Sequence, residues 1–359
     1  MADGSMPSIY ELNMLALMTA AELADVTLLV DTDPFAEPDA DGAALLDEFL
    51  AASKSEAEPA TRIDGGNGGE CDHAGGDNAI DELEASPTET ATATTTADVV
   101  EIDAHAALLA AHSPVLRAII VDERRAGVTT KILVPISGLA EAAVRAALTY
   151  MYTGRVTEMD AGWVVDFIEF GIRYQVPLLV ELGELFVAEE VTVETAAVMW
   201  TAGLRFGNAT VVERMAQFAL DPSFSCAFLG HPSFASLPYQ VVAALAADTA
   251  LVVDELTVFS ALAAWIAANL PGYPATLDTE AATQAAGLLE AVRYPLLSPD
   301  ALADTVEPSG LVPAWLLAEA YRFHATGRSP SSSDSGSTLR FTPRAEPPPA
   351  SPLTASPRM

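Results

Sequence analysis

Residues 102–154 read IDAHAALLAAHSPVLRAIIVDERRAGVTTKILVPISGLAEAAVRAALTYMYTG, and this stretch decides the fold. The residues before it, 99–102, have a β-type composition. A run of apolar residues at helical spacing follows. Ser113-Pro114 restarts the helix, because proline suits a first turn and disrupts a helix interior. The first half of the stretch therefore predicts a strand followed by two consecutive helices.

The second half of the stretch predicts one more strand and one more helix. We expect a polar loop over residues 122–130 and then a strand over 131–134, which Pro135 ends. Apolar residues at helical spacing predict a long helix over 139–151. Gly154 closes this helix in a turn.

The composition of the chain excludes several classes of partner. The chain has 359 residues, enough for two domains, and half of them are hydrophobic. Its net charge is −33, from 17 basic and 50 acidic residues. Basic residues must neutralise phosphates in nucleic-acid complexes and at anionic membranes. We therefore expect no nucleic-acid and no membrane partner.

The cysteines and the N-terminus indicate where the protein resides. Cys71 and Cys226 lie in different kinds of sequence, so a disulfide framework is not expected and a reducing compartment fits. The first residues lack the basic and apolar regions of a signal peptide. The most apolar long run, 241–270, contains three acidic residues, which is unfavourable for a membrane span. We expect a cytoplasmic or nuclear protein.

The N-terminal segment 9–23 has a helical pattern with apolar side chains nearly all round. A helix that is apolar on every side requires burial on every side. Pairing of identical subunits is the commonest way to provide it, and the alternative is a helix that caps its own core. We favour a homodimer, with an interface formed by Ile9, Leu12, Leu15 and Ala16.

A long insertion separates two segments that would ordinarily form a hairpin. A β-type run over 25–30 is followed by the next strand only at residue 98 or 99. The intervening residues 32–97 are acidic and of low complexity, as in GGNGGE and ASPTETATATTTA, which predicts a disordered insertion. Each doubling of loop length costs only about 0.6 kcal/mol of closure free energy, so the fold can tolerate this loop.

The chain after Gly154 is almost entirely helical in pattern. We expect helices over 162–174, 178–187, 193–206 and 209–219, with Pro177 opening the second of them. The C-terminal segment 326–359 is rich in serine and proline, which predicts a disordered tail.

Two groups of motifs resemble the BTB/POZ domain. The family pattern D-V-T … A-H-x-x-[LV]-L-A-x-x-S-P-x-[FL]-R-A is matched by Asp25-Val26-Thr27, Ala104-His105, Leu108-Leu109-Ala110, Ser113-Pro114 and Leu116-Arg117-Ala118. The pattern L-x-Y-[MI]-Y-T-G is matched by Leu148 and Tyr150-Met151-Tyr152-Thr153-Gly154. The resemblance implies an α+β BTB/POZ domain over 7–190, interrupted by the insertion 32–97. In this family the first helix is a dimerisation element.

The following segment resembles the BACK domain, which succeeds BTB in many adaptor proteins. Its central pattern is matched by Leu237-Pro238, Val242, Leu245, Asp248, Leu251, Val253-Asp254-Glu255, Val258-Phe259, Ala261 and Trp265. Its later pattern is matched by Leu288-Leu289 and Val292-Arg293-Tyr294-Pro295-Leu296-Leu297-Ser298. The resemblance implies an all-α BACK-like domain over 191–325, followed by the tail 326–359. No kelch-type β repeat is visible after Leu317.

Together the two resemblances imply a substrate-recruiting adaptor of a cullin-3 RING ubiquitin ligase that acts as a BTB dimer. The sequence leaves the protein substrate unidentified. The cullin-contacting loop of the family often carries an apolar-x-Glu triplet, whose usual place here is Arg124-Arg125-Ala126, which does not match. A triplet of the right composition, Val121-Asp122-Glu123, lies three residues earlier. The candidate cullin contacts are Val121, Asp122, Glu123, Arg124 and Tyr152.

Two alternatives remain open. Transcriptional BTB domains usually have Lys or Arg after the motif histidine, near the aspartate of the first strand, whereas this chain has Ala106 beside Asp25. That difference, and the lack of a zinc-finger pattern, weigh against a corepressor-recruiting regulator. The other alternative is a self-associating scaffold with no ligase role.

We find no motif for catalysis or for cofactor binding. The histidines fall singly, with no nucleophile elbow, phosphate loop, dinucleotide fingerprint or metal-ligand spacing. The paired carboxylates Asp254 and Glu255 are expected to be charges at a helix start, where the helix dipole favours them. We therefore expect no enzyme, no metal and no cofactor.

Overall fold

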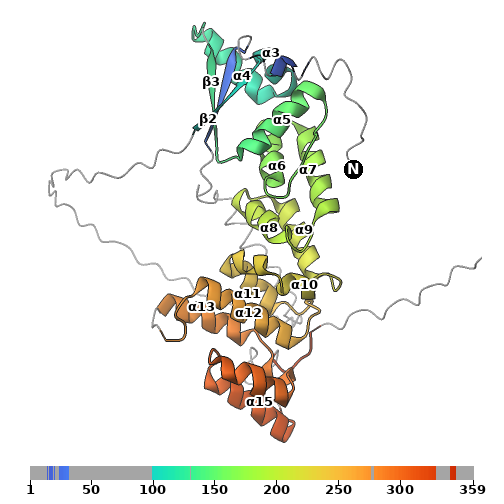
Figure 1. Ribbon diagram of the computed structural model, residues 1–359, viewed down its shortest axis with the longest axis vertical. Helices are drawn as coiled ribbons and strands as arrows, with labels where there is room; N and C mark the ends of the chain where they lie inside the picture. Colours follow the sequence, from blue (N-terminus) through green and yellow to red (C-terminus); the bar gives the residue numbers. More distant parts are fainter. Residues whose placement is uncertain are drawn as a thin grey trace, which may run out of the picture.

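The computed structural model describes residues 14, 16–18, 20, 24–31, 99–129, 131–275, 279–328 and 340–344. The molecule is elongated, with a small sheet at one end and helix α15 at the other (Figure 1). Helices α5 to α13 lie between these two ends. The predicted insertion 32–97 lies outside the described residues.

A three-stranded sheet organises the first domain. Its strands are β1 (Val26–Asp31), β2 (Val99–Ala104) and β3 (Ile132–Ser137), in the order β2-β1-β3. Strand β1 pairs antiparallel with β2 over its whole length and parallel with β3. The two strands on either side of the insertion therefore pair as a hairpin would, as the sequence predicted.

Pro135 does not end strand β3, and the sequence prediction on this point is wrong. The backbone N–H groups of Ile132 and Gly138 donate to Asp25 and Asp31 at the two ends of β1. Because N–H groups alternate in direction along a strand, those of the even-numbered residues point toward β1 and position 135 points away from it. Strand β3 is an edge of the described sheet, where proline leaves no ladder hydrogen bond unmade.

Local backbone signals position the helices of the first domain, α3 (Ala106–His112), α4 (Pro114–Arg125) and α5 (Glu141–Thr153). Ser113 separates the first two, because its hydroxyl accepts a hydrogen bond from the N–H of Leu116 at 3.0 Å and caps α4. Gly154, at φ 73°, ends α5 in the left-handed region. The predictions for Ser113-Pro114 and for Gly154 are confirmed.

The remaining chain is helical. Its α-helices are α6 (Val164–Arg173), α7 (Pro177–Glu190), α8 (Ala196–Arg205), α9 (Ala209–Leu220), α10 (Ser225–Leu229), α11 (Tyr239–Ala247), α12 (Glu255–Asn269), α13 (Thr279–Glu290), α14 (Pro299–Ala301) and α15 (Ala314–Thr326). Single turns of other helix types are η2 (Pro232–Ser236), η3 (Tyr294–Leu296), η4 (Leu302–Val306) and η5 (Glu307–Ser309). Pro177 opens α7, as predicted. No helix in the described part of the chain combines the length and the apolar character needed to cross a bilayer.

Two hydrophobic cores share helix α6. Phe167 and Phe170 belong to the core under the sheet, whereas Val164 and Ile168 belong to the core of the helical domain. A helix with buried residues on opposite faces joins the two cores into one packed body.

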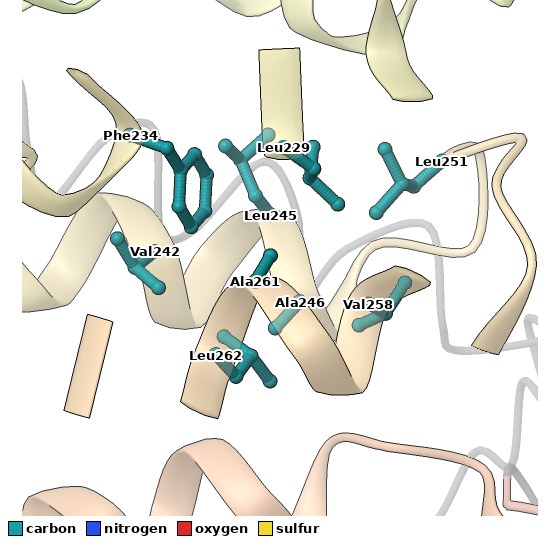
Figure 2. A pocket seen from close by; sticks show the side chains of 9 residues that line it. All are labelled: Leu229, Phe234, Val242, Leu245, Ala246, Leu251, Val258, Ala261 and Leu262. Atoms are coloured by element: carbon teal, nitrogen blue, oxygen red, sulfur yellow. The ribbon is translucent and has the colours of Figure 1, made fainter. Parts of the chain in front are cut away.

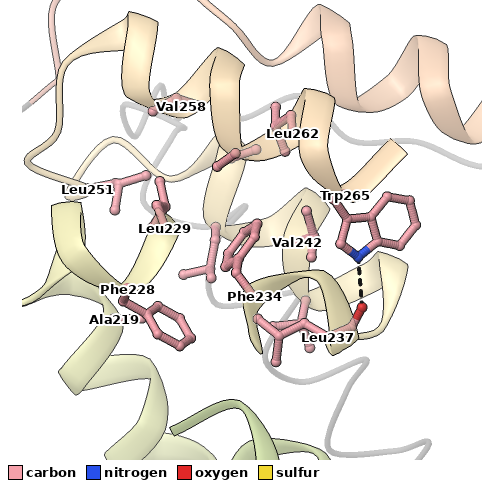
Figure 3. Packing of buried hydrophobic residues seen from close by; sticks show 14 of the residues in the cluster. Ala219, Phe228, Leu229, Phe234, Leu237, Val242, Leu251, Val258, Leu262 and Trp265 are labelled. Carbon is pink, nitrogen blue, oxygen red and sulfur yellow. Dashed lines mark hydrogen bonds between the residues drawn. The ribbon is translucent and has the colours of Figure 1, made fainter. Parts of the chain in front are cut away.

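The core of the helical domain is built around aromatic side chains and helix α12. Phe228 and Phe234 pack edge to face with ring centroids 5.7 Å apart. Trp265 is buried, and its Nε1–H donates to the carbonyl oxygen of Leu237 at 2.9 Å (Figure 3). The one polar atom of the indole is therefore satisfied while its ring fills the core.

Candidate protein-interaction site

The candidate contact residues 121–124 lie in the last turn of helix α4, not in a loop. The N–H of Ala126 donates to the carbonyl oxygen of Asp122 at 2.8 Å. The helix ends at Arg125, and Gly127, two residues later, has a φ of +92°. The expectation of a loop from residue 122 onward is therefore wrong, and it begins four residues later.

Helical geometry separates Val121 from Glu123. Residues two apart on an α-helix point about 200° apart and do not face each other. Both side chains are exposed, and 38% of the Val121 surface is accessible. Between them, Asp122 pairs with Arg125 at 3.5 Å, and both of these side chains are more than 70% exposed. The apolar-x-Glu triplet is thus at the surface, but its apolar and acidic members do not share one side of the helix.

Arg124 is anchored to the start of the sheet. Its guanidinium donates to Oδ2 of Asp25 at 3.0 Å. The other carboxylate oxygen of Asp25 accepts the backbone N–H of Ala106 at 2.8 Å, at the first turn of α3. Asp25 therefore holds strand β1, the start of α3 and the end of α4 together.

Tyr152 does not belong to this exposed surface. It is 2% exposed, and its hydroxyl oxygen accepts the backbone N–H of His105 at 3.0 Å and lies 2.7 Å from that residue's Nδ1. Burial raises the pKa of Tyr152. Tyr152 positions the segment leading into α3 and offers no surface to a partner. His105 packs and hydrogen-bonds inside the domain, as expected.

The described part of the first helix has one face on its own domain. Met14, Leu17 and Met18 are spaced as one helix face and pack against the core under the sheet. Ala16, on the other side, is exposed. The other three predicted interface residues, Ile9, Leu12 and Leu15, lie outside the described residues.

The carboxylates at the start of α12 differ from each other. Asp254 caps the helix by accepting the N–H of Thr257 at 2.9 Å, as expected for a charge at a helix start. Glu255 is instead 7% exposed and is held by Arg344 at 2.7 Å and by Arg293 at 3.9 Å. Both residues are therefore charges at a helix start, as expected, and Glu255 is in addition buried in an ion pair that the sequence did not predict.

Residues 340–344 pack on the helical domain, which the serine- and proline-rich composition of 326–359 did not predict. Arg344 is 7% exposed beside Glu255. Arg340 lies over the Trp315 ring at 5.1 Å. The sequence contains only an indirect signal for this contact, two arginines flanking an aromatic residue in an otherwise acidic chain.

A second buried carboxylate lies where the two domains meet. Asp166 on α6 is 3% exposed and accepts the backbone N–H of Ala140 at 3.0 Å and the guanidinium of Arg205 at 2.7 Å. Burial raises the pKa of Asp166, and the nearby Arg205 opposes that rise. Asp166 thereby joins the start of α5 to the end of α8.

The helical domain contains a small apolar gap between its buried side chains. One cavity, lined by nine apolar side chains of the helical domain, has a volume of about 10 Å³, which is about the size of one water molecule (Figure 2). With only apolar walls, it is a packing gap. Within the described residues, no three His, Cys, Asp or Glu side chains gather in a way that could hold a metal ion.

Comparison with known families agrees with this architecture. Residues 83–190 match the model of the BTB/POZ domain, and residues 205–307 match the BACK model, described as BTB And C-terminal Kelch. The chain thus belongs to the proteins in which a BTB/POZ domain is followed by a BACK domain. These are interaction domains of an adaptor family. No curated protein matches the chain.

Proposed function

We propose that this protein is a dimeric adaptor that binds cullin-3 through the end of helix α4 and presents a protein substrate for ubiquitin transfer. The observation that carries the proposal is the pairing of a BTB/POZ domain with a BACK domain, joined through the shared helix α6. Two binding surfaces on one packed body raise the local concentration of a substrate near the transferring enzyme.

The exposed end of α4 supports the choice of contact surface. Val121, Asp122, Glu123 and Arg124 are all exposed there. The Asp25–Arg124 and Asp122–Arg125 pairs are at the surface, so a partner can rearrange either at a cost of about 1 kcal/mol or less. Because Val121 and Glu123 point apart, the partner has to contact two sides of the helix end.

The first helix supports dimerisation. Met14, Leu17 and Met18 cover the helix's own core, while Ala16 faces outward. In the sequence, Ile9 and Leu12 precede Ala16 by seven and four residues, which is the spacing that a helical pattern repeats. An apolar sequence pattern of this spacing fits an isologous contact between two copies.

A self-associating scaffold is the second candidate. The observation that favours it is the geometry of α4, which separates the apolar and acidic members of the triplet. In that case the chain pairs with itself and binds no cullin.

Binding of the cullin-3 N-terminal domain to the full chain tests the proposal. Titration calorimetry on Val121→Glu and Glu123→Lys should show affinity losses of about tenfold or more, corresponding to about 1.4 kcal/mol. Glu213→Lys, a matched charge reversal at an exposed position on α9, should change the affinity less than about twofold. Equal affinity in all three variants would exclude the α4 surface, and no binding to the wild-type chain would favour the scaffold.

A further inference from the structure

The guanidinium of Arg344 occupies a site that satisfies most of its donors. Nε donates to Oε1 of Glu255 at 2.7 Å, and Nη1 donates to the carbonyl oxygen of Asp248 at 2.7 Å. Nη2 donates to the carbonyl oxygen of Ala246 at 2.9 Å and to Oε2 of Glu255 at 3.3 Å. Acceptors spread over Nε, Nη1 and Nη2 match the fork of a guanidinium, and a lysine ammonium cannot satisfy them in the same way.

The residues before Arg344 have contacts of their own on the same domain. Arg340 pairs with Glu319 at 3.3 Å and lies over Trp315 on α15. Phe341 packs on Phe323 with ring centroids 5.2 Å apart.

The backbone of the segment is also held. The carbonyl oxygen of Thr342 accepts a hydrogen bond from Arg293 at 2.8 Å. Residues 340–344 form neither helix nor strand. They lie on the domain as a bound peptide does, anchored by the side chains of Arg340, Phe341 and Arg344.

The site can lose this segment without leaving a buried charge unpaired. Glu255 also faces Arg293, whose Nε is 3.9 Å from the carboxylate and whose backbone N–H donates to Oε2 at 3.1 Å. With Arg344 bound, one carboxylate faces two guanidinium groups. With Arg344 gone, Glu255 and Arg293 remain as a neutral pair, so the large penalty for an isolated buried charge does not arise.

We propose that this site on the BACK domain is a receptor for an arginine-containing peptide of a partner protein, and that residues 340–344 of the chain occupy it as a tethered ligand. The net charge of −33 attracts a basic partner segment. In the sequence, the 13 residues 327–339 separate the ligand from the end of α15, and a connection of this length gives an effective concentration on the order of millimolar. A second copy at micromolar concentration competes poorly with that, whereas a tighter-binding partner peptide displaces the tether. The site is distinct from the α4 surface and does not depend on cullin binding.

The test uses the full chain and a fluorescein-labelled peptide of residues 338–346, TLRFTPRAE. The double variant Arg340→Ala/Arg344→Ala removes the main anchors of the tether and opens the site. Fluorescence anisotropy should show the peptide binding the double variant at least about tenfold more tightly than the wild-type chain, because the wild-type tether competes. A peptide with lysine at the position of Arg344 should lose about tenfold or more in affinity for the double variant.

Three outcomes would overturn the proposal. One is no binding of the peptide to the double variant at about 100 µM, provided that this variant still melts cooperatively. Another is equal affinity for the arginine and lysine peptides, which would mean that the site recognises positive charge and not the shape of the guanidinium. The third is displacement of the peptide by micromolar wild-type chain, which would identify a second copy as the occupant. If the double variant does not melt cooperatively, Arg344→Lys replaces it. Its tether should bind the site more weakly than the wild-type tether does. The labelled peptide must therefore still bind this variant more tightly than it binds the wild-type chain.

Discussion

An arginine meets a carboxylate in each of the two domains of this molecule, in opposite surroundings. Near the sheet, Arg124 pairs with Asp25 at 3.0 Å, and the two side chains are 39% and 45% exposed. In the helical domain, Arg344 pairs with Glu255 at 2.7 Å, and the two side chains are 4% and 7% exposed. The same chemical pair is therefore solvated in the first domain and enclosed in the helical domain.

The difference in exposure decides which kind of partner each ion pair can accommodate. An exposed pair contributes about 0–1 kcal/mol and is screened by salt, so it can open when a partner arrives. An enclosed pair persists only with its other donors and acceptors satisfied, and it selects for the guanidinium shape. The surface at the end of helix α4 is thus suited to a broad protein contact, and the site around Glu255 is suited to one specific side chain.

Removing the enclosed carboxylate should have the largest effect. Glu255→Ala leaves the guanidinium groups of Arg293 and Arg344 without their carboxylate, and we expect a loss of about 3–5 kcal/mol in the free energy of unfolding. Arg124→Ala is the matched change at the exposed pair and should cost less than about 1 kcal/mol. Urea unfolding of both variants measures these losses. Equal losses in the free energy of unfolding would remove the distinction between the exposed and the enclosed pair.

The buried carboxylate at the domain junction should have an intermediate effect. Asp166→Ala removes the acceptor for Arg205 and for the N–H of Ala140, and we expect a loss of about 2–3 kcal/mol, since Arg205 is partly exposed. The control is Glu141→Ala, which breaks an exposed pair with Arg145 and should cost less than about 0.5 kcal/mol. An Asp166 variant as stable as the control, in the same urea titration, would show that this carboxylate does not join the domains.

The smallest expected effect is on the pH dependence of stability, through the ion pair between Asp103 and Lys131 at the sheet. The hydrogen bond from Lys131 holds the pKa of Asp103 below its ordinary value. Ionised Asp103 therefore stabilises the fold fully above its unfolded-state pKa of about 4. This stabilisation is lost as the pH falls through the lower folded-state pKa. Asp103→Asn should reduce stability at pH 7 by less than about 1 kcal/mol.

Comparing the variant with the wild-type chain at several pH values checks the sign. The gap in stability between the two should narrow as the pH falls below about 4. A gap that widens toward low pH would contradict the assignment of Asp103.

Local rules explain what the sequence could predict. Ser113-Pro114, Gly154 and Pro177 act through their own backbone conformation, so their roles hold in almost any fold. The BTB and BACK motifs are equally visible because they consist of spaced side chains along a single stretch. The polar run at 122–125 was misread as a loop, since a solvated helix turn and a loop have the same composition.

The contacts that the sequence could not predict are distant ones. Glu255 lies beside Asp254 in the chain, but it is buried against Arg344, 89 positions away. The motif made Tyr152 a candidate contact for a partner protein, but its hydroxyl is buried against His105, 47 positions away. No local pattern links either residue to its partner, so only the folded structure reveals the two contacts.

Sedimentation of the intact chain with the cullin-3 N-terminal domain tests the adaptor account most directly. The chain has a mass of 37.5 kDa, and the account predicts that it sediments alone at twice this mass. With excess cullin-3 domain, the complex should contain two copies of each protein, because each subunit of the dimer presents its own α4 end. A stable monomer that gains no mass on addition of the cullin-3 domain would contradict the account.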